Sequence, residues 1–480
     1  MDIITLIEGF VEGLLQAGEK FTQHPEQFAR LEQTVSELSS RAAADFLAMT
    51  LTQTDELIRC NGRRKREYNI QRRDSRTLIT TVGDVTFQHT LFQNKETKKC
   101  RYLLDEMIRL PIHERFSSQA EAKVLSEAEV HSYQHAADSL CIGAQKISKT
   151  AVMEKVHGIT EELPEQKTLA DENKKWCEYL YIEADEDHIH RQKCGEKEGS
   201  MLGKLVYLFE GKEEVCKGKR ILIHPHYHGG LYAGSEANRQ LWEEIEKYIE
   251  EHYDTEYLKK VYINSDGGGW IRLGKDYVDR SVLVADRFHL MKYINRVSNL
   301  MGENKDSIKG MFYRYIYKDK LTAVKKLLTR IRNQAGHEEM VEDTRTYFIN
   351  NWEAIQTAFH DKHALGCSAE GHVSCVYSER MSSRPMGWSE TGGDRMCRLR
   401  CYVRNYGRDK IIELVEYRRE KQMGRLAATG TEGLVEFEEK RRYVTEERRR
   451  AMKYIERLQA RIPGDTVRKV ISIRERLNEL

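Results

Sequence analysis

The sequence predicts an α/β core flanked by mainly helical regions. Two apolar segments of strand length run directly into an aspartate, Asp185 in Tyr179–His190 and Asp266 in Val261–Trp270. Segments before and after this part of the chain repeat apolar residues at spacings of three to four, as amphipathic helices do. A carboxylate at the end of a buried strand is costly unless a cation or hydrogen bonds compensate it, so these acids are the first candidates for function.

Composition places the chain among large soluble proteins. Its 480 residues allow several domains and a sizeable core, and 32% of them are charged. Long apolar runs are lacking, so we expect no membrane span, and the amphipathic start carries Asp2, Glu8 and Glu12, unlike a signal peptide. Ten scattered cysteines without a CxxC pair predict reduced thiols and a cytoplasmic, nucleoid-associated protein. Cys397 and Cys401 lack partners at zinc-finger spacing.

Shifts in pattern predict four regions. Residues 1–58 form an N-terminal helical region, and residues 59–158 form a DNA-binding region. An α/β core follows over residues 176–400, with a helical insertion at about 290–363. A basic helical region, residues 401–480, ends the chain.

Opposed charge patches underlie the net charge of +2. Basic residues dominate from Arg59 to Arg76, just before a hairpin predicted at Thr77–Leu91 around Gly83-Asp84. A basic run often forms no more than the solvated face of a helix. Several such runs beside an acidic cluster indicate a surface for a polyanion, double-stranded DNA. The residues that we expect to contact it here are Arg63, Arg64, Lys65 and Arg66.

A helix-turn-helix pattern spans Ser132–Val156, with its turn at Gly143. In such units the second helix enters the major groove, which makes Lys146, Ser148 and Lys149 candidate DNA contacts. Ser148 is also suited to cap the second helix. Helix pairs of this shape are common in proteins that never bind DNA.

The core segments follow a characteristic order of three strands, a helix and two strands. We expect them at Glu178–Arg191, Met201–Phe209, Arg220–His226, Glu236–Tyr253, Lys260–Ser265 and Ser281–Ala285. This is the order of the ribonuclease-H-like fold, in which the first and fourth strands lie side by side. That arrangement would bring Asp185 and Asp266 together.

Four segments carry a resemblance to a known family: IEADEDHIH, NSDGGGW, ADRFHLMKY and AEGHVSCVYSERMSSRPMGWS. They resemble the bacterial insertion-sequence transposases of the ISLre-two type, a group classed as an uncharacterised protein family and similar to Mutator-like Asp-Asp-Glu transposases. The resemblance runs from about residue 60 to about residue 420. Asp286-Arg287-Phe288-His289 matches the Asp/Cys-x-x-His signature of that superfamily.

The resemblance implies a metal site made of three acids. Asp185, Asp266 and Glu370 would be the catalytic residues and would ligate Mg²⁺ or Mn²⁺, two ions in all. Asp286 and His289 would support the site from beneath.

Two of these acids have rivals. Asp187 competes as the first acid, because residues two apart on a strand share a face. Glu379 and Glu390 compete with the third. The polar set that contains Arg380 and Arg384 is suited to gripping the DNA backbone.

The resemblance implies a DNA transposase that binds element ends, cleaves a strand and joins it to target DNA, working as a homo-oligomer. A nuclease or resolvase of the same fold would share the acids and metals. A transposase-derived DNA-binding protein would keep the basic region and lose an acid.

Overall fold

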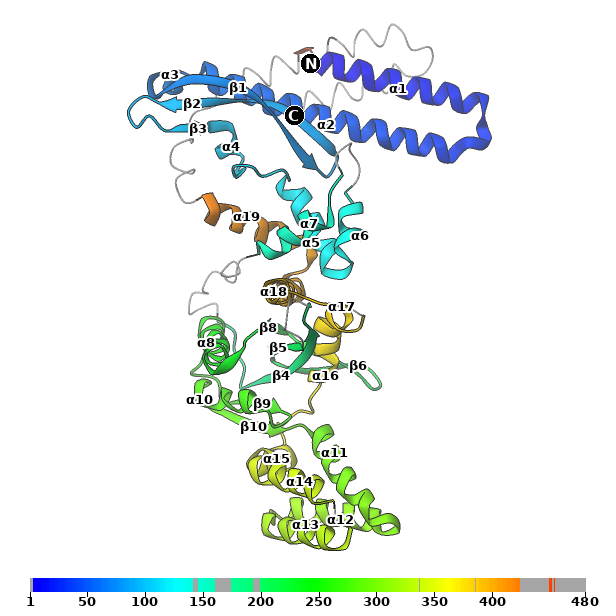
Figure 1. Cartoon of the computed structure of the whole chain (residues 1–480), viewed down its shortest axis with the longest axis vertical. Helices are drawn as coiled ribbons and strands as arrows, with labels where there is room; N and C mark the ends of the chain where they lie inside the picture. The colour runs from blue at the N-terminus through cyan, green and yellow to red at the C-terminus, as the bar shows by residue number, and fades with distance from the viewer. Residues whose placement is uncertain are drawn as a thin grey trace. The chain divides into compact units, whose positions relative to one another are not determined.

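The computed structural model describes residues 3–140, 146–159, 174–192, 199–335, 337–384, 386–423, 449, 450 and 453. The chain divides into two compact units. Unit 1 is Met1–Lys155 with Ile411–Leu480, and unit 2 is Val156–Lys410. The architecture is mixed α/β with helices toward both termini, as predicted (Figure 1). Among the described helices, none combines the length and apolar character that crossing a bilayer requires.

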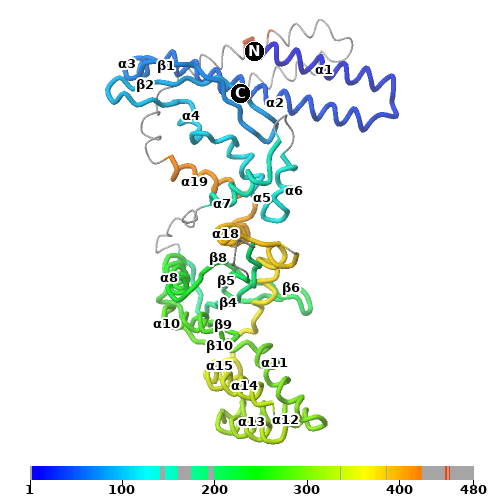
Figure 2. The backbone as a smooth tube through the Cα atoms, in the orientation of Figure 1, coloured from blue at the N-terminus to red at the C-terminus, as the bar shows by residue number. Residues whose placement is uncertain are grey.

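Unit 1 begins with two long helices, α1 (Ile3–Gln23) and α2 (Phe28–Cys60), joined by the short turn η1 (Pro25–Gln27). They run side by side as an antiparallel pair (Figure 2). A Cβ at Gly13 would lie 2.7 Å from the Leu38 side chain, so the glycine permits the close approach of the two helices.

A three-stranded antiparallel sheet follows α2. Its elements are α3 (Gly62–Glu67), β1 (Tyr68–Thr80), β2 (Gly83–Asn94), β3 (Cys100–Tyr102) and α4 (Leu103–Met107). The predicted hairpin is therefore present and longer than expected. Helix α2 packs on β2, where the buried Asp55 carboxylate accepts hydrogen bonds from Thr90 N at 2.9 Å and Thr90 Oγ1 at 2.7 Å. This contact joins the regions predicted as 1–58 and 59–158 into one unit.

The rest of unit 1 combines segments from distant parts of the chain: α5 (Ser118–Val130), α6 (Tyr133–Asp138), α7 (Lys149–His157) and α19 (Ile411–Met423). The fully buried Glu121 of α5 binds Arg418 and Arg419 of α19, the latter at 2.8 Å. Residues 411–423 of the predicted C-terminal region thus belong to unit 1. Most of that region beyond residue 423 lies outside the described residues.

Unit 2 is built on a five-stranded mixed sheet in the order β10-β9-β4-β5-β8 (Figure 1). The strands are β4 (Tyr179–His190), β5 (Ser200–Phe209), β8 (His226–Gly230), β9 (Lys260–Ser265) and β10 (Ser281–Ala285). β4, β9 and β10 run parallel, while β5 is antiparallel to both β4 and β8. The predicted first and fourth strands, β4 and β9, are neighbours.

The prediction of the third strand was wrong. Of the predicted strand Arg220–His226, only His226 joins the main sheet, as the first residue of β8 (His226–Gly230). β6 (Gly211–Cys216) and β7 (Lys219–Ile223) form a separate two-stranded sheet, and the main sheet continues at β8. His224 adopts φ +48°, a left-handed conformation that interrupts an extended chain between β7 and β8.

The two faces of the sheet are covered differently. One face packs against α8 (Gly234–His252) through an apolar core that includes Ile182, Val206 and Trp242. The other face carries tyrosines and Glu183. It lies against α16 (Ala369–Val373), the π-helical η4 (Ser374–Ser378) and α18 (Glu390–Tyr406), with α17 (Glu379–Met381) following η4.

A helical insertion follows β10, as predicted. It consists of α11 (Arg287–Ser298), η3 (Asn299–Asn304), α12 (Lys305–Tyr317), α13 (Leu321–Ala335), α14 (Glu338–Asn350) and α15 (Trp352–His360). Two short helices, α9 (Gly269–Arg272) and α10 (Gly274–Tyr277), connect β9 to β10, and η5 (Arg408–Lys410) follows α18. Helices α11 to α15 share an apolar core around Phe312, Leu328 and Phe348. Helix α15 packs on β10, so the insertion is anchored at the edge of the sheet.

Candidate functional site

Three aspartates lie in one row just past the point where the parallel pairing of β4, β9 and β10 ends. β4 pairs with β9 so that Glu183 faces Asn264, and β10 pairs with β9 so that Ala285 faces Ser265. Continuing both registers past these pairs brings Asp185, Asp266 and Asp286 level with one another. The backbone confirms the position of Asp286, because Asp286 N donates to Ser265 O at 3.0 Å. We call these three residues the acid row.

The turn after β9 presents the second acid. Gly267 adopts φ +108°, and Gly268 N donates to Asp266 Oδ1 at 2.8 Å, so the carboxylate is held by its own turn. A Cβ at Gly267 would lie 3.0 Å from Asn351 Nδ2 and 3.2 Å from Tyr347 Cε2. The helical insertion therefore packs directly against this turn, and a glycine is needed there for both conformation and space.

The charge of Asp266 affects the pKa of Asp185. Burial raises the pKa of Asp185 to about 6, and the Asp266 carboxylate adds to the rise. A hydrogen bond from Glu186 N to Asp185 Oδ1 at 2.8 Å and the charge of His289 act in the opposite direction. The first two predicted acids therefore lie within electrostatic range of each other.

Asp286 begins α11 and orients His289. Its Oδ1 accepts from Phe288 N at 3.0 Å, and its Oδ2 lies 2.6 Å from His289 Nδ1. This contact raises the pKa of His289, and the charges of Asp266 and Asp185 raise it further. Burial opposes the ionisation of Asp286, but the hydrogen bonds lower its pKa below the ordinary value. The predicted supporting pair, Asp286 and His289, is thus an ion pair, of which Asp286 belongs to the acid row.

Asp187 makes a different contact. Its Oδ2 accepts a hydrogen bond from Ser382 Oγ at 2.7 Å, which commits it to the segment after α17. Asp185 and Asp187 share a face of β4, as predicted, but the carboxylate that interacts with Asp266 is that of Asp185. The register thus sets Asp185, and not Asp187, level with Asp266.

The three candidates for the third acid lie at exposed positions of unit 2. Glu370 is on α16, next to the acid-bearing strand β4. The Glu379 carboxylate lies 3.8 Å from Arg400 and is 70% exposed, and Glu390 pairs with Arg191. The electrostatic partners of Asp185 are Asp266, His289 and Glu186, and none of these three glutamates is among them. The acid that the fold places in the row is Asp286.

Glu183 is a buried residue that the sequence-based prediction missed. Its carboxylate is fully buried and accepts from Tyr207 Oη, from Lys212 Nζ at 2.8 Å and from Ser368 N at 2.7 Å. These bonds tie the β6–β7 hairpin and the start of α16 to β4. Its position inside an apolar run was the available signal, because a charge there must have buried partners.

A pocket of about 760 Å³ lies beside this network. Its lining includes Lys212, Arg220, Tyr227, Cys367 and His372. Burial raises the pKa of the Cys367 thiol, and the charges of Glu183 and Asp286 add to the rise. Cys367 therefore lines the pocket and also lies within electrostatic range of Glu183 and Asp286.

The prediction that Arg64 of unit 1 contacts DNA was wrong. Arg64 is only 5% exposed, its Nε donates to Ile58 O at 3.3 Å, and its guanidinium lies over the Phe92 ring. It faces inward because its side chain packs between Ile58 of α2 and Phe92 of β2. Arg63, Lys65 and Arg66 on the same helix are exposed.

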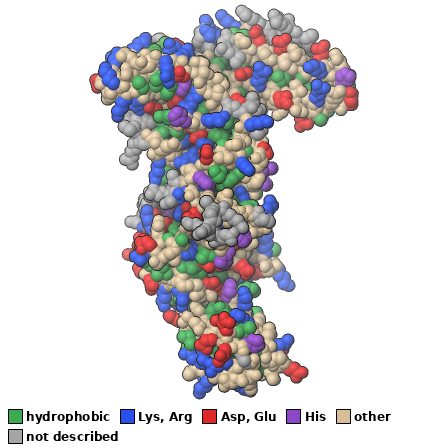
Figure 3. Space-filling model, viewed as in Figure 1, with side chains coloured by type: hydrophobic (Ala, Val, Ile, Leu, Met, Phe, Trp, Pro, Cys, Tyr) green, Lys and Arg blue, Asp and Glu red, His purple; other side chains and the backbone are tan. Residues whose placement is uncertain are grey.

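The lysines of the β2–β3 turn extend this basic surface. Lys95 Nζ donates to Lys65 O at 2.7 Å, which holds the turn against α3, and Lys98 and Lys99 are exposed beside it. Lys and Arg side chains line the outer margin of this part of unit 1 (Figure 3).

The helix-turn-helix candidates are exposed. Lys146, Ser148 and Lys149 all lie on the surface, and Ser148 Oγ accepts from Ala151 N at 3.1 Å, as predicted for a helix cap. The turn at residues 141–145 lies outside the described residues.

Arg380 was also assigned to the wrong environment. It is only 6% exposed, and its guanidinium lies 4.9 Å from the centroid of the Trp388 ring, so it is part of the core and not of a DNA surface. Arg384 is exposed, as a phosphate contact requires.

Cys397 and Cys401 are packed inside unit 2. Both are buried in α18, where Cys401 Sγ lies 3.6 Å from Tyr377 Oη and Cys397 Sγ lies 3.8 Å from Met381 Sδ. Burial raises the pKa of Cys401 to about 12, which keeps the thiol protonated.

Comparisons place the chain among known proteins. A protein of Caldanaerobacter subterraneus subsp. tengcongensis, named as a UPF0236 protein, is 30% identical over 407 residues, covering 84% of each chain. A Streptococcus gallolyticus protein, the UPF0236 protein in the vanSb 3′ region, is 26% identical over 80% of this chain and 85% of its own. A solved structure, the Drosophila P element transposase strand transfer complex, matches 66% of this chain and 93% of its own at 10% identity, with a TM-score of 0.21.

The family profile described as "Uncharacterised protein family (UPF0236)" matches residues 22–418. With most of its length matched and a relative at 30% identity, the chain belongs to the UPF0236 family.

Proposed function

We propose that this protein is a DNA transposase of the Asp-Asp-Glu type, which cleaves DNA at element ends and joins it to a target. The observation that carries the proposal is the acid row, in which Asp266 is close enough for its charge to raise the pKa of Asp185. The sheet supports it, because three antiparallel strands are followed by two strands parallel to the first, in the order β10-β9-β4-β5-β8, and this is the order expected for a ribonuclease-H-like core.

The carboxylates fit divalent metal ions. Asp185 and Asp266 each use Oδ1 to accept from a backbone amide, which leaves Oδ2 of each carboxylate for a metal ion. Two adjacent carboxylates also repel each other, which the pKa of Asp185 reflects, and a shared cation would relieve this repulsion. Mg²⁺ or Mn²⁺ bound here would stabilise the charge on the attacking and leaving oxygens of a phosphodiester.

The protein's own residues position that chemistry. The Gly267 turn fixes Asp266 against the helical insertion, and Asp286 orients His289 beneath the two acids. His289, with its raised pKa, contributes positive charge that offsets the carboxylates. Arg220 in the adjacent pocket and Arg384 after α17 are exposed and suited to contact backbone phosphates.

Unit 1 supplies the proposed DNA-binding surfaces. Exposed basic side chains on α3 and the β2–β3 turn suit contacts to phosphates, which depend on charge and not on sequence. The start of α7, with Lys146 and Lys149, suits a groove contact. A transposase needs such binding in addition to its nuclease centre, whereas a nuclease without site preference does not.

The name of the Caldanaerobacter relative joins eleven locus designations from one genome. Several copies of one gene in a genome are what a mobile element leaves, so this multiplicity supports the proposal.

A cleavage and joining assay tests the function. The substrate is a duplex that carries the DNA flanking the gene, with a second duplex as target and Mg²⁺ or Mn²⁺ as the metal. Asp266→Asn should reduce cleavage at least about 100-fold, since several kcal/mol of charge stabilisation depend on the metal site. Asp276→Asn, which changes an exposed aspartate on α10, is the matched control and should cleave normally.

The products separate the alternatives. Joined products establish a transposase. Cleavage without joining would make the protein a nuclease or resolvase, and DNA binding without cleavage in any metal would make it a DNA-binding protein.

The same assay identifies the third acid. We propose Glu370, on the helix beside β4, as the third ligand, with Asp286 positioning His289. Glu370→Gln should then cost as much cleavage as Asp266→Asn, whereas Asp286→Asn should cost less. Loss on Asp286→Asn with normal cleavage by Glu370→Gln would make Asp286 the third ligand. Loss on Glu379→Gln or Glu390→Gln would move the ligand to that residue.

A further inference from the structure

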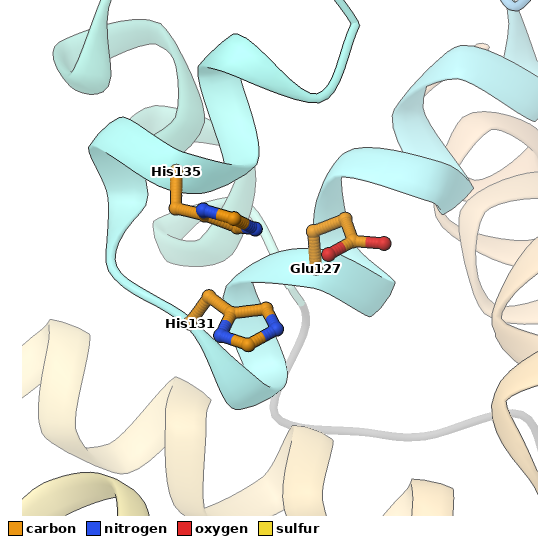
Figure 4. Close-up of side chains that lie close together, drawn as sticks. All are labelled: Glu127, His131 and His135. Carbon is orange, nitrogen blue, oxygen red and sulfur yellow. The ribbon is translucent and has the colours of Figure 1, made fainter.

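Unit 1 contains a second group of side chains that can ligate a metal. Glu127 lies in the last turn of α5, His131 follows the end of that helix, and His135 lies on α6. The three side chains point toward one another across the junction of the two helices (Figure 4). Each offers one ligand atom, and these atoms all lie within 4.8 Å of one another.

Backbone contacts hold this junction in place. His131 N donates to Glu127 O at 2.8 Å and closes the last turn of α5. Ser132 Oγ accepts from His135 N at 3.2 Å and caps α6. The three residues, each four positions after the last, therefore converge in space, and the two imidazole centroids lie 4.3 Å apart.

The ligand types select the metal. Two imidazoles and one carboxylate suit Zn²⁺ and similar first-row transition ions, whereas Mg²⁺ prefers oxygen ligands alone. Zn²⁺ takes four ligands, so three protein groups leave one position for water or for a group from a partner. Both histidines are exposed and Glu127 is half-buried, so an ion can reach the site from solvent.

We propose that Glu127, His131 and His135 bind one transition-metal ion, Zn²⁺ in its simplest form, at the α5–α6 junction. The ion would link the end of α5 to α6, the first helix of the helix pair that precedes α7. Its role would be to stabilise the fold of unit 1. The site is distinct from the acid row in ligand type, since histidine nitrogen dominates here and carboxylate oxygen dominates there.

Cobalt spectroscopy of the full chain tests the proposal. Co²⁺ replaces Zn²⁺ and gives visible absorption bands at sites containing nitrogen ligands, so the titration reports both stoichiometry and ligand type. The background is Asp185→Asn with Asp266→Asn, which weakens metal binding at the acid row. We expect one equivalent of Co²⁺ to bind and one equivalent of Zn²⁺ to displace it.

Matched variants assign the ligands. His131→Ala with His135→Ala should weaken Co²⁺ binding at least tenfold, and the loss of Zn²⁺-dependent stabilisation should follow in a thermal melt. His24→Ala with His113→Ala removes two other exposed histidines of unit 1 and should bind Co²⁺ like the background protein. Equal binding by the His131/His135 and His24/His113 pairs, or an equal loss in both, would overturn the proposal.

A third variant tests ligation independently of folding. His135→Cys exchanges an imidazole for a thiolate and should keep binding while adding a thiolate-to-cobalt charge-transfer band in the near ultraviolet. Retained binding without that band would remove His135 from the ligand set.

Discussion

The pKa of Asp185 reflects its burial and its position beside Asp266. Burial and the neighbouring Asp266 both favour its protonated form, so its pKa rises to about 6 from an ordinary value of 3.8. A carboxylate that served only as a salt-bridge partner would have its pKa lowered. The raised value instead indicates that burial, and to a smaller extent the charge of Asp266, disfavours the ionised carboxylate, and a bound cation would correct this.

We predict that metal-free protein gains stability from this group as pH falls. The folded state holds the Asp185 proton more tightly than the unfolded state, so the penalty is complete above pH 6 and disappears on acidification toward pH 4. After allowance for solvent screening the penalty is about 1–2 kcal/mol. Asp185→Asn should remove it and raise the melting temperature at pH 7.5 in EDTA.

Mg²⁺ should reverse this trend in the wild-type protein. The ion binds the ionised carboxylates, so it should stabilise the protein more at pH 7.5 than at pH 5. Melting curves at both pH values measure the effect, with Asp276→Asn as the control. An Asp185→Asn protein that still gained the full Mg²⁺ stabilisation would contradict the assignment of Asp185 as a ligand.

Helix α3 shows how one short element divides its basic residues between two tasks. Arg64 points inward, donates to Ile58 O and covers Phe92. Burial lowers its pKa, a sign that its surroundings are protein and not solvent. Lys65 and Arg66 point outward beside the β2–β3 turn. Four consecutive basic residues on a helix cannot all face one side, because successive positions differ by about 100° around the axis.

We predict that these residues separate in two assays. Arg64→Ala should destabilise unit 1 by about 1–3 kcal/mol, through lost packing and a lost hydrogen bond, and leave the salt dependence of DNA binding unchanged. Lys65→Ala with Arg66→Ala should leave stability unchanged within about 0.5 kcal/mol and reduce the slope of log K against log salt by about 2. Thermal melts and filter binding measure the two quantities. A reduced slope for Arg64→Ala in folded protein would contradict its structural role.

Unit 1 is closed by residues from both ends of the sequence. Glu121 is fully buried and binds Arg418 and Arg419 of α19, with Lys155 at 3.9 Å. A buried carboxylate that loses a partner costs more than an exposed pair does, because its charge is left without compensation. The described part of the C-terminal region is therefore a structural component of unit 1.

We predict that Arg419→Ala destabilises unit 1 by about 3–5 kcal/mol and leaves unit 2 unchanged. The five tryptophans, Trp176, Trp242, Trp270, Trp352 and Trp388, all belong to unit 2, so their fluorescence follows that unit alone. Far-ultraviolet circular dichroism follows both units. The dichroism transition should shift to lower urea while the fluorescence transition stays.

Glu420→Ala is the control for this experiment. Glu420 pairs with Arg109 at the surface, with both side chains about half exposed, so its removal should cost less than about 1 kcal/mol. A parallel shift of the fluorescence transition in Arg419→Ala would show that the two units do not unfold separately.

The sequence by itself determined the elements of the core and two of its acids. β4, α8, β9 and β10 lie within a residue or two of their predicted positions, because apolar periodicity over a single segment encodes its type and burial. Asp185 and Asp266 follow from the same local pattern, since each stands where a buried run ends. The glycines after Asp266 marked the turn.

Only the tertiary structure decided which groups meet. Asp286 joins the acid row because the β10–β9 and β4–β9 registers bring it level with Asp266 and Asp185, which lie 20 and 101 positions before it in the sequence. Arg64 and Arg380 are buried by segments that no local pattern identifies, and His224 moves the third strand to β8. Periodicity reports a residue's own element, whereas strand order, register and burial depend on contacts between distant segments.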